Sequence, residues 1–400
     1  MNILLVNLKF PDTFWSFKHA LEFVGKRSAL PPLGLLTVAA MLPPDWSLRL
    51  VDTNVRGLTD KDLAWADCAF ISAMVVQRES ARRIVARCKE AGLRVVAGGP
   101  LFSSEHEQFE NVDHFILNEA ELTLPPFLED LAQGRPRRLY ASAEFANLRQ
   151  TPMPRWDLLS LKRYASMGIQ FTRGCPFNCY FCNVTALLGH CVRMKTSAQI
   201  IAELDGLYAL GWRGDVFFVD DNFIGNKQFL KTDLLPALIA WRKQKAGNVF
   251  FTEASINLAD DKPFTKLYER MKQKGRLRAE SSGDNVDGTT NIIPTMSIES
   301  LKEGYRRILD HIYSPAPYYQ RVRTFLREYR GPHVRGTFKF SHLLALVRSV
   351  YRIGFVGRER RHYRKLLLWT QFRRPRLIPD AVIFAIYGYH FRKICERHVV

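Results

Sequence analysis

The sequence has no run of about twenty apolar residues, which is what a helix needs to cross a bilayer, so we expect no membrane-spanning helix. Its seven cysteines are odd in number and lack paired spacings. This argues against a secreted disulfide framework and favours a reducing compartment. The apolar start, Met1–Phe10, lacks a basic n-region and is too short for a signal peptide, so we expect a first β-strand there. The sequence therefore predicts a globular, cytoplasmic protein.

Acidic residues are scarce, with 39 Asp and Glu against 58 Lys and Arg, and the net charge is +19. Residues 320–400 hold 16 Arg and 3 Lys against 4 acidic residues, so 19 minus 4 places +15 in this last part. Aromatic and apolar residues are interspersed there, as in RKLLLWTQFRRPRL. This composition favours either peripheral contact with an anionic membrane or a packed helical region. Nucleic acid is the least favoured partner.

Three cysteines lie within nine residues, GCPFNCYFC, at positions Cys175, Cys179 and Cys182. Thiolates are soft ligands that suit iron–sulfur clusters and zinc. Three thiolates on one short loop can hold three irons of a cubane cluster and leave the fourth iron open for chemistry. The spacing therefore predicts a [4Fe–4S] site with one free coordination position.

Structural zinc is the alternative interpretation of this cysteine group. It would take His190 or Cys191 as a fourth ligand. Structural zinc sites usually combine two short cysteine or histidine pairs, and only one compact group is present here. With the basic composition, this alternative would describe a zinc-stabilised nucleic-acid-binding protein.

The cysteine spacing, the aromatic residue after the second cysteine and the apolar lead-in at residues 167–171 resemble the cluster loop of radical S-adenosylmethionine (SAM) enzymes. The resemblance implies that the three cysteines ligate the cluster and that SAM binds the fourth iron through its amino and carboxylate groups. Reduction would then cleave SAM to a 5′-deoxyadenosyl radical. The protein's own task would be to position and shield these cofactors.

Residues 1–135 alternate short apolar strands with helical segments, which predicts a doubly wound, Rossmann-like parallel sheet. We expect helices at residues 79–91 and 121–131. The expected strands are residues 3–8, 47–52, 68–74, 93–97 and 114–117.

The segment PPLGL at residues 31–35 and the Gly-Gly-Pro turn after the fourth expected strand resemble the cobalamin-binding radical SAM enzymes. The Asp-x-His-x-x-Gly cobalamin motif is absent, so the resemblance implies cobalamin bound without a histidine ligand, with residues 74–77 beneath the corrin. Ligands of such sheets bind beyond the carboxyl ends of the strands. The candidate cobalamin contacts there are Asp52, Asn54, Ser72, Met74, Gln77, Gly98, Gly99, Pro100, Glu119 and Glu121.

After a predicted linker at residues 136–165, a partial radical SAM β/α barrel is expected at residues 166–265. Its expected strands are residues 168–173, 215–220 and 248–256, and a capping box at Thr196 predicts the start of a helix. Polar residues after barrel strands face the active-site mouth, although the adjacent acids after the second strand also suit a helix cap or a solvated turn. The candidate SAM contacts are Tyr180, Phe181, Asp220, Asp221, Asn222, Glu253 and Ser255.

The segments FFVDDNFIGN, FTEASINLADD and LYERMKQKGRL resemble a subgroup of cobalamin radical SAM proteins with a distinctive, DUF4070-like C-terminal extension. The hopanoid methylases belong to this subgroup. In that subgroup, roughly the second half of the barrel separates the counterparts of LADD and LYERM, whereas here only KPFTK does. Each βα repeat takes about thirty residues. We therefore expect a barrel without its fourth to sixth strands, followed by a basic, mostly helical extension at residues 266–400.

The resemblance implies a cobalamin-dependent C-methyltransferase that acts on an unactivated carbon of a small-molecule, hydrophobic or lipid substrate, with an external electron donor. The shortened barrel leaves a second interpretation open. In that interpretation, the chain is a non-catalytic remnant that binds the cluster and cobalamin without turnover.

Overall fold

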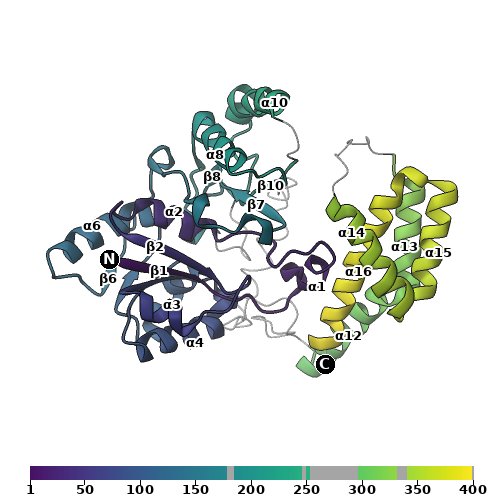
Figure 1. The fold of residues 1–400 in the computed structure, drawn as a ribbon, viewed down its shortest axis with the longest axis horizontal. Helices are drawn as coiled ribbons and strands as arrows, with labels where there is room; N and C mark the ends of the chain where they lie inside the picture. Colours follow the sequence, from purple (N-terminus) through teal and green to yellow (C-terminus); the bar gives the residue numbers. More distant parts are fainter. Residues whose placement is uncertain (178–183, 246–248, 253–295, 331–339, 399–400) are drawn as a thin grey trace. The chain divides into compact units, whose positions relative to one another are not determined.

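The computed structural model describes residues 1–177, 184–245, 249–252, 296–330 and 340–398 (Figure 1). These residues confirm the expected fold class, an α/β protein that ends in helices. The described chain forms two compact units. The α/β unit comprises Met1–Phe10 and Leu30–Arg270, and the helical unit comprises Pro11–Ala29 and Met271–Val400.

The α/β unit contains a six-stranded, wholly parallel sheet with the order β2-β1-β3-β4-β5-β6. The last residue of β1, Asn7, is in register with both Asp52 and Ser72, so the carboxyl ends of three neighbouring strands lie at one edge. The strands are β1 (Asn2–Asn7), β2 (Ser47–Asp52), β3 (Cys68–Ser72), β4 (Arg94–Gly98), β5 (His114–Ile116) and β6 (Leu139–Tyr140). The five expected strands are confirmed, and β6 was not predicted.

Both faces of this sheet are covered, as expected for a doubly wound fold. In β1, Leu4 and Val6 belong to one buried cluster, while Ile3 and Leu5 belong to another. Strands that are buried on both faces read as continuous apolar runs, as β1 does. The helices of this part are α2 (Leu33–Met41), α3 (Asp60–Trp65), α4 (Arg78–Glu90), α5 (Pro100–Glu105) and α6 (Ala120–Ala132).

A second parallel sheet has the order β11-β10-β7. Its three strands overlap the three barrel strands expected from the sequence, although residues 253–256 of the third lie outside the described residues. Among the described residues no fourth strand pairs with β11. At the start of α8, Thr196 Oγ1 accepts from the backbone N–H of Gln199, and Gln199 Oε1 accepts from that of Thr196, which confirms the capping box. The elements are β7 (Ser166–Ile169), α7 (Val184–Leu188), α8 (Ser197–Ala209), β10 (Asp215–Phe218), α9 (Lys227–Phe229), a π-helix (Leu230–Leu234), α10 (Leu235–Gln244) and β11 (Phe250–Thr252).

The expected strand at residues 168–173 is wrong in its second half. The backbone leaves β7 after Ile169, and β8 (Thr172–Arg173) pairs with β9 (Arg193–Met194) in antiparallel fashion. The two short strands close the base of the loop that carries the cysteines. Sequence periodicity does not show such a break, because buried residues lie on both sides of it, Ile169 before it and Phe171 and Thr172 after it.

The helical unit contains α12 (Ile298–Tyr313), α13 (Pro315–Glu328), α14 (Phe340–Ser349), a π-helix (Val350–Val356), α15 (Arg360–Arg373) and α16 (Ile378–His398). It also includes α1 (Lys18–Leu21) from the start of the chain. The backbone oxygens of Glu22 and Phe23 accept from Arg348, and the backbone oxygen of Phe14 bonds His390. None of the described helices is long and apolar enough to cross a membrane.

The remaining short helices are 3-10 turns that connect these elements. They cover Phe14–Ser16, Val75–Gln77, His106–Gln108, Leu148–Gln150, Trp156–Leu158, Leu161–Arg163 and Pro375–Leu377.

Candidate cofactor site

The loop that carries the cysteines begins at Gly174, whose φ is +87°. A side chain at this position would collide with the backbone oxygen of Cys191, and left-handed backbone favours glycine in any case. The backbone N–H of Cys175 donates to the oxygen of Gly189 at 3.1 Å. The first cysteine is therefore fixed against the returning end of its own loop.

Of the three predicted cluster ligands, the structure describes Cys175, which is half-buried. Cys179 and Cys182 lie outside the described residues, as do the predicted SAM contacts Tyr180, Phe181, Glu253 and Ser255. Among the described residues, no group of three or more Cys, His, Asp or Glu side chains is placed to hold a metal ion. The predicted ligand set of three thiolates has the right chemistry for a [4Fe–4S] cluster and remains a prediction.

The residues named for the zinc alternative, His190 and Cys191, are exposed, and the backbone of Cys191 lies against Gly174. This places Cys191 on the loop segment that borders the first cysteine. The zinc interpretation therefore keeps a candidate fourth thiolate, and metal analysis has to decide it.

Asp220 follows β10 and is almost completely buried, with 2% of its surface exposed. Its carboxylate accepts from the backbone N–H of Phe171 at 3.2 Å, from the Thr172 hydroxyl at 2.6 Å and from the Thr172 backbone N–H. Burial raises its pKa to about 6, although these hydrogen bonds oppose the rise. In this structure Asp220 fixes the backbone between β7 and β8, directly before the cysteine loop.

A second buried charge pair lies close to Asp220. Lys195, which follows β9, forms an ion pair with Glu203 of α8, and the two side chains are only 3% and 2% exposed. Burial raises the pKa of Glu203, the Lys195 charge lowers it, and the nearby Asp220 adds a smaller upward contribution. The backbone N–H of Lys195 also donates to the oxygen of Phe171 at 2.9 Å. Two acids and one lysine thus form a buried polar group next to the segment that leads into the cysteine loop.

A pocket of about 490 Å³ adjoins the start of the cysteine loop. Its volume lies in the range of small-molecule sites. The predicted SAM contact Asn222 lines it and is buried, while Asp221 is exposed. The pocket is lined by Pro176, Phe177, Val192, Asn222, Ile224, Gly225, Asn226 and Lys227. The structure therefore brings one loop aromatic and the turn after β10 to the same cavity.

Two arginines that flank the cysteine loop are paired with two acids at the start of α6. Arg193 contacts both oxygens of Glu119, at 2.6 and 2.9 Å, and Arg173 contacts Glu121 at 2.8 Å and Glu119 at 3.4 Å. Glu119 also accepts from the backbone N–H of Ala146. This ion-pair network joins both strands at the base of the loop to the first sheet.

Sequence reasoning assigned Glu119 and Glu121 to cobalamin and missed their arginine partners. Burial alone would raise the pKa of Glu121, but the hydrogen bond and charge of Arg173 outweigh burial and lower it. Removing one member of such a buried pair commonly destabilises a protein by roughly 3–5 kcal/mol. The sequence feature that could have indicated these ion pairs is the position of Arg173 and Arg193 immediately beside the cysteine loop.

At the carboxyl edge of the first sheet, three predicted cobalamin residues lie together because β3 and β4 are neighbours. Ser72 is in register with Gly98, and a side chain on Gly99, whose φ is +91°, would lie 2.7 Å from Ser72 Oγ. A side chain on Gly98 would lie 2.7 Å from the oxygen of Ile116. Pro100 then occupies the first turn of α5. Close packing between strands already accounts for both glycines.

Asp52 and Asn54 are bonded within the chain. Asp52 is buried and accepts from the backbone and side-chain N–H groups of Asn54 and, at 2.9 Å, from the hydroxyl of Tyr164. Asn54 in turn accepts from the backbone N–H of Phe10 and donates to the oxygen of Leu8. Burial and the Asp52 charge raise the pKa of Tyr164. These contacts hold the strand ends in place.

The loop after β3 exposes an apolar residue at the same edge. Met74 is 51% exposed, while Gln77 is buried and bonds both the backbone N–H of Met74 and the oxygen of Leu8. A thioether held on a fixed loop is a suitable neighbour for the apolar face of a corrin. The exposure of Met74 leaves its side chain accessible to a ligand at this edge, and the assignment of Ser72, Met74 and Gly99 to cobalamin remains a prediction.

Residues 265–400 match the family described as Domain of unknown function (DUF4070). An uncharacterized methyltransferase of Synechocystis sp. is 46% identical over 270 residues, which cover 67% of this chain and 50% of the relative. The hopanoid C-2 methylase of Rhodopseudomonas palustris is 35% identical over 263 residues, with 64% and 50% covered. The chain spans about half the length of these curated relatives.

Two solved structures are also similar. The cobalamin-dependent SAM radical enzyme OxsB, solved with aqua-cobalamin and SAM, matches with a TM-score of 0.49 and 20% identity, covering 68% of this chain and 41% of that chain. The radical SAM methyltransferase TsrM of Kitasatospora setae, solved with tryptophan and a SAM analogue, has a TM-score of 0.45 and 16% identity, with 61% and 52% covered.

The sequence relatives confirm the predicted resemblance to hopanoid methylases and to their C-terminal extension. The aligned segment covers half of each of these two relatives. The chain is thus similar, over about two thirds of its length, to the hopanoid C-2 methylase and to an uncharacterized methyltransferase, and its residues 265–400 match the DUF4070 family.

Proposed function

We propose that this chain is a cobalamin-dependent radical SAM enzyme and that its reaction is C-methylation. The observation that carries the proposal is the cysteine loop. It leaves a strand end that is fixed by Asp220 and opens beside a pocket of about 490 Å³. Homology to curated methyltransferases supports the same reaction class.

In this proposal Cys175, Cys179 and Cys182 hold the cluster, and the adjoining pocket receives SAM. Bound cluster, SAM and cobalamin would supply radical initiation and the methyl group. Asp220 holds the backbone before the first cysteine in one position. Phe177 and the buried Asn222 line the pocket. The remaining predicted SAM contacts stay proposals.

Cobalamin would bind at the carboxyl edge of the first sheet. Met74 would contact the corrin face, and Ser72 and Gly99 would border it, because the three residues lie on adjacent strand ends. Asp52, Asn54, Glu119 and Glu121 would act as positioning residues, since each is bonded to other parts of the chain. This arrangement orients the first sheet toward the cysteine loop through Arg173 and Arg193.

The proposed substrate is a small molecule, and its class is hydrophobic or lipid. Support for a lipid comes from the homology to hopanoid C-2 methylase and from the basic, aromatic C-terminal region. An external electron donor would reduce the cluster. We further propose a cytoplasmic protein with peripheral membrane contact through the C-terminal region, and no role for nucleic acid.

A non-catalytic cofactor-binding remnant is the second candidate. It is favoured by one observation, that the chain spans about half the length of its curated relatives. Both candidates predict cluster binding, so the colour of the protein does not distinguish them, whereas a measurement of turnover does.

The test is anaerobic reconstitution with iron and sulfide, reduction with dithionite, and chromatographic detection of 5′-deoxyadenosine formed from added SAM. We expect 5′-deoxyadenosine from the wild type and none from Cys179→Ala. Cys88→Ala is the matched control, because Cys88 is buried in the first sheet's core, and it should retain the product. A brown, cluster-loaded protein without product would support the remnant, and a colourless zinc-loaded protein would support the zinc alternative.

A further inference from the structure

Helix α15 exposes large apolar side chains on the side opposite its buried face. Tyr363, Leu366 and Thr370 pack into the helical unit and are at most 2% exposed. Leu368 and Phe372 lie on the other side of the helix and are 60% and 82% exposed. An exposed aliphatic and aromatic pair on one helix face indicates an interaction surface more than a packing surface.

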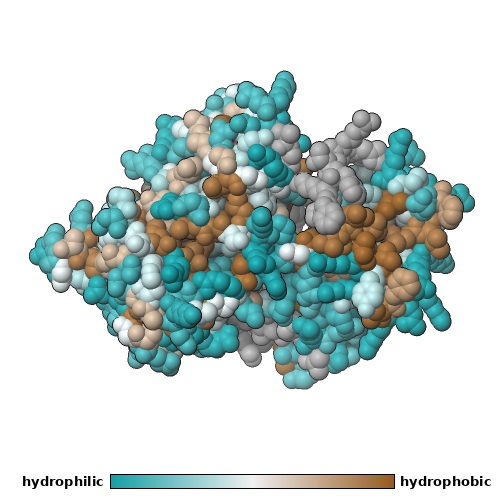
Figure 2. Space-filling model, in the orientation of Figure 1, coloured by the Kyte–Doolittle hydropathy of each residue, from teal (hydrophilic) through white to brown (hydrophobic). Residues whose placement is uncertain are grey.

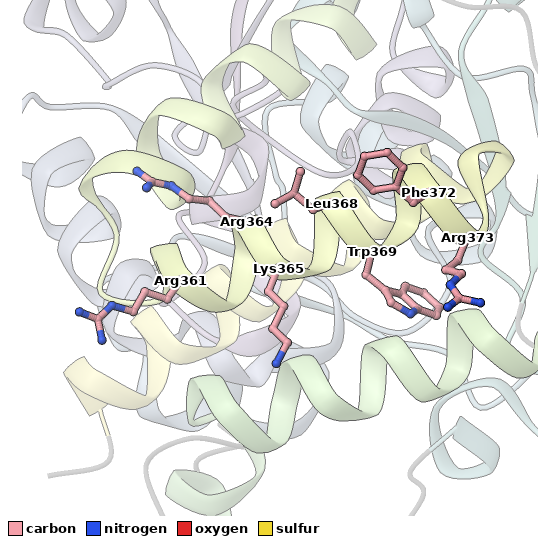
Figure 3. A pocket seen from close by; sticks show the side chains of 7 residues that line it. All are labelled: Arg361, Arg364, Lys365, Leu368, Trp369, Phe372 and Arg373. Atoms are coloured by element: carbon pink, nitrogen blue, oxygen red, sulfur yellow. The ribbon is translucent and has the colours of Figure 1, made fainter.

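Basic residues border this apolar pair. Figure 3 shows two rows of side chains along α15, each with a four-residue spacing. A shallow hollow of about 580 Å³ lies over them. The first row is Arg364, Leu368 and Phe372, and the second is Arg361, Lys365, Trp369 and Arg373.

A second apolar row runs along α14 and the π-helix that follows it. Its four members, Leu343, Val347, Tyr351 and Phe355, recur every four residues and are 43%, 57%, 65% and 62% exposed. Residues four apart lie on one face of a helix. The hydropathy colouring shows brown residues of the helical unit at its surface among teal ones (Figure 2).

Arg364 connects the apolar row of α14 and the π-helix to the first row of α15. Its guanidinium carbon lies 4.9 Å from the centre of the Phe355 ring, and its Nε donates to the oxygen of Gly354 at 2.7 Å. This contact joins the π-helix end of the α14 row to α15. We name the exposed apolar residues of both rows, with the basic residues that border them, the α14–α15 surface.

The charge of this surface is predominantly positive. Residues 340–373 contain eight Arg and Lys residues and one acid, Glu359. Two of the eight, Arg352 and Arg358, form ion pairs with Glu22 and Glu396, so the positive charge comes mainly from the arginines and lysine of α15 that line the hollow. Glu359 is buried and forms an ion pair with Arg392, so it does not offset the exposed arginines. A strongly basic surface with an apolar centre is complementary to an anionic membrane, where phosphates meet acyl chains.

We propose that the α14–α15 surface docks on an anionic lipid bilayer, which deepens the peripheral contact proposed above by assigning it to named residues. Leu368 and Phe372 enter the boundary between headgroups and acyl chains. Arg361, Lys365 and Arg373 lie at the level of the lipid phosphates. Nucleic acid explains the arginines but gives Leu368 no partner, because its phosphate backbone contacts basic and polar groups.

The experiment is cosedimentation of the full chain with phosphatidylcholine vesicles, with and without phosphatidylglycerol. We expect binding only to the anionic vesicles, and high salt should weaken it. The double variant Arg361→Gln, Lys365→Gln should lower partitioning on the order of tenfold, since each basic residue near such a surface contributes about 1 kcal/mol. The double variant Arg82→Gln, Arg83→Gln on α4 is the control, because it changes the net charge by the same amount and both arginines are exposed.

The apolar centre is tested separately. Leu368→Ala, Phe372→Ala should lower partitioning on the order of tenfold through lost apolar burial. Met153→Ala, Leu210→Ala changes comparably exposed residues of the α/β unit and should not lower it. Because the assay needs no cofactor or turnover, its failure and a failure to form 5′-deoxyadenosine are separate results.

Three results would overturn the proposal. The first is equal binding to neutral and anionic vesicles, and the second is unchanged binding by both surface variants. The third is that the surface variants abolish self-association in sedimentation velocity or duplex binding in a gel shift while vesicle binding persists. That result would assign the surface to a second copy or to nucleic acid.

Discussion

Protonation of Asp220 affects the stability of the buried segment that leads into the cysteine loop. Burial raises its pKa to about 6, so the folded state holds this proton more tightly than the unfolded state, whose value is 3.8. A raised carboxyl pKa stabilises the fold below the unfolded value and loses that contribution as pH rises through the folded value. The contribution of Asp220 should therefore decline between these two values and stay level above about pH 6.

We predict that the difference in unfolding free energy between wild type and Asp220→Asn changes by about 1 kcal/mol between about pH 5 and pH 7. The wild type should be relatively more stable at the lower pH, because the asparagine side chain of the variant does not titrate. Urea unfolding at the two pH values measures this difference. A difference that stays constant with pH would contradict the burial of the ionised carboxylate.

Several polar residues after the strands were found from the sequence, but their partners were not. Tyr164 and Asp52 are 112 positions apart, and Arg193 and Glu119 are 74 apart. A single sequence gives the chemistry of each side chain and its place at a strand end. It does not give a pairing across such distances, because that pairing depends on how the sheets pack.

At the scale of elements, neighbouring arginines of the basic region serve different purposes. Arg374 donates to the backbone oxygens of Arg327 and Tyr329 at 2.8 and 2.6 Å and so binds the C-terminal end of α13. Cations near helix C-termini stabilise the unpaired carbonyl groups there. Arg373, one residue earlier, lines the α14–α15 surface. Composition alone treats the two residues as equal.

We predict that Arg374→Ala lowers the free energy of unfolding by about 1 kcal/mol, because two charge-assisted hydrogen bonds are lost. Arg373→Ala is the matched control and should stay within about 0.5 kcal/mol of the wild type. Thermal or urea unfolding of both variants measures the contrast. Equal loss in the two variants would mean that the contacts of Arg374 to α13 contribute little.

Elements with strong local signals were predicted well. The strand at 47–52 agrees with β2 at both ends, and the helix at 79–91 agrees with α4 to within one residue. The two-residue strand β6 lies in the expected linker and has no pattern of its own. It forms because the oxygen of Tyr140 and the edge of β5 come together, which is a consequence of tertiary structure.

For the whole molecule, the packing of residues 11–29 within the helical unit was not predicted. The sequence analysis placed this segment in the Rossmann-like domain of residues 1–135, whereas the structure groups it with the helical unit. Phe23 is completely buried, with its ring 5.4 Å from that of Tyr389 and the guanidinium of Arg352 at 5.6 Å. The contact depends on residues more than three hundred positions away.

We predict that Phe23→Ala destabilises the helical unit by roughly 3–5 kcal/mol, the usual range for a buried phenylalanine. Hydrogen exchange should accelerate in α13, α15 and α16 and stay nearly unchanged in β1 and β3. Trp15→Ala is the control, because Trp15 is 70% exposed. Equal protection of α16 in Phe23→Ala and wild type would contradict a structural role for this segment.

The course of the chain through the two units also bears on its biosynthesis. Residues 11–29 leave the ribosome long before Arg348 and His390, which bond to this segment across 326 and 376 positions. Phe23 therefore stays unburied until Arg352 and Tyr389, which contact its ring, have been translated. The sheet of the α/β unit can form in the meantime, because β1 to β6 are translated early. A ribosome that stalls before residue 348 would release a chain with a folded sheet and an exposed aromatic segment, which chaperones and proteases recognise.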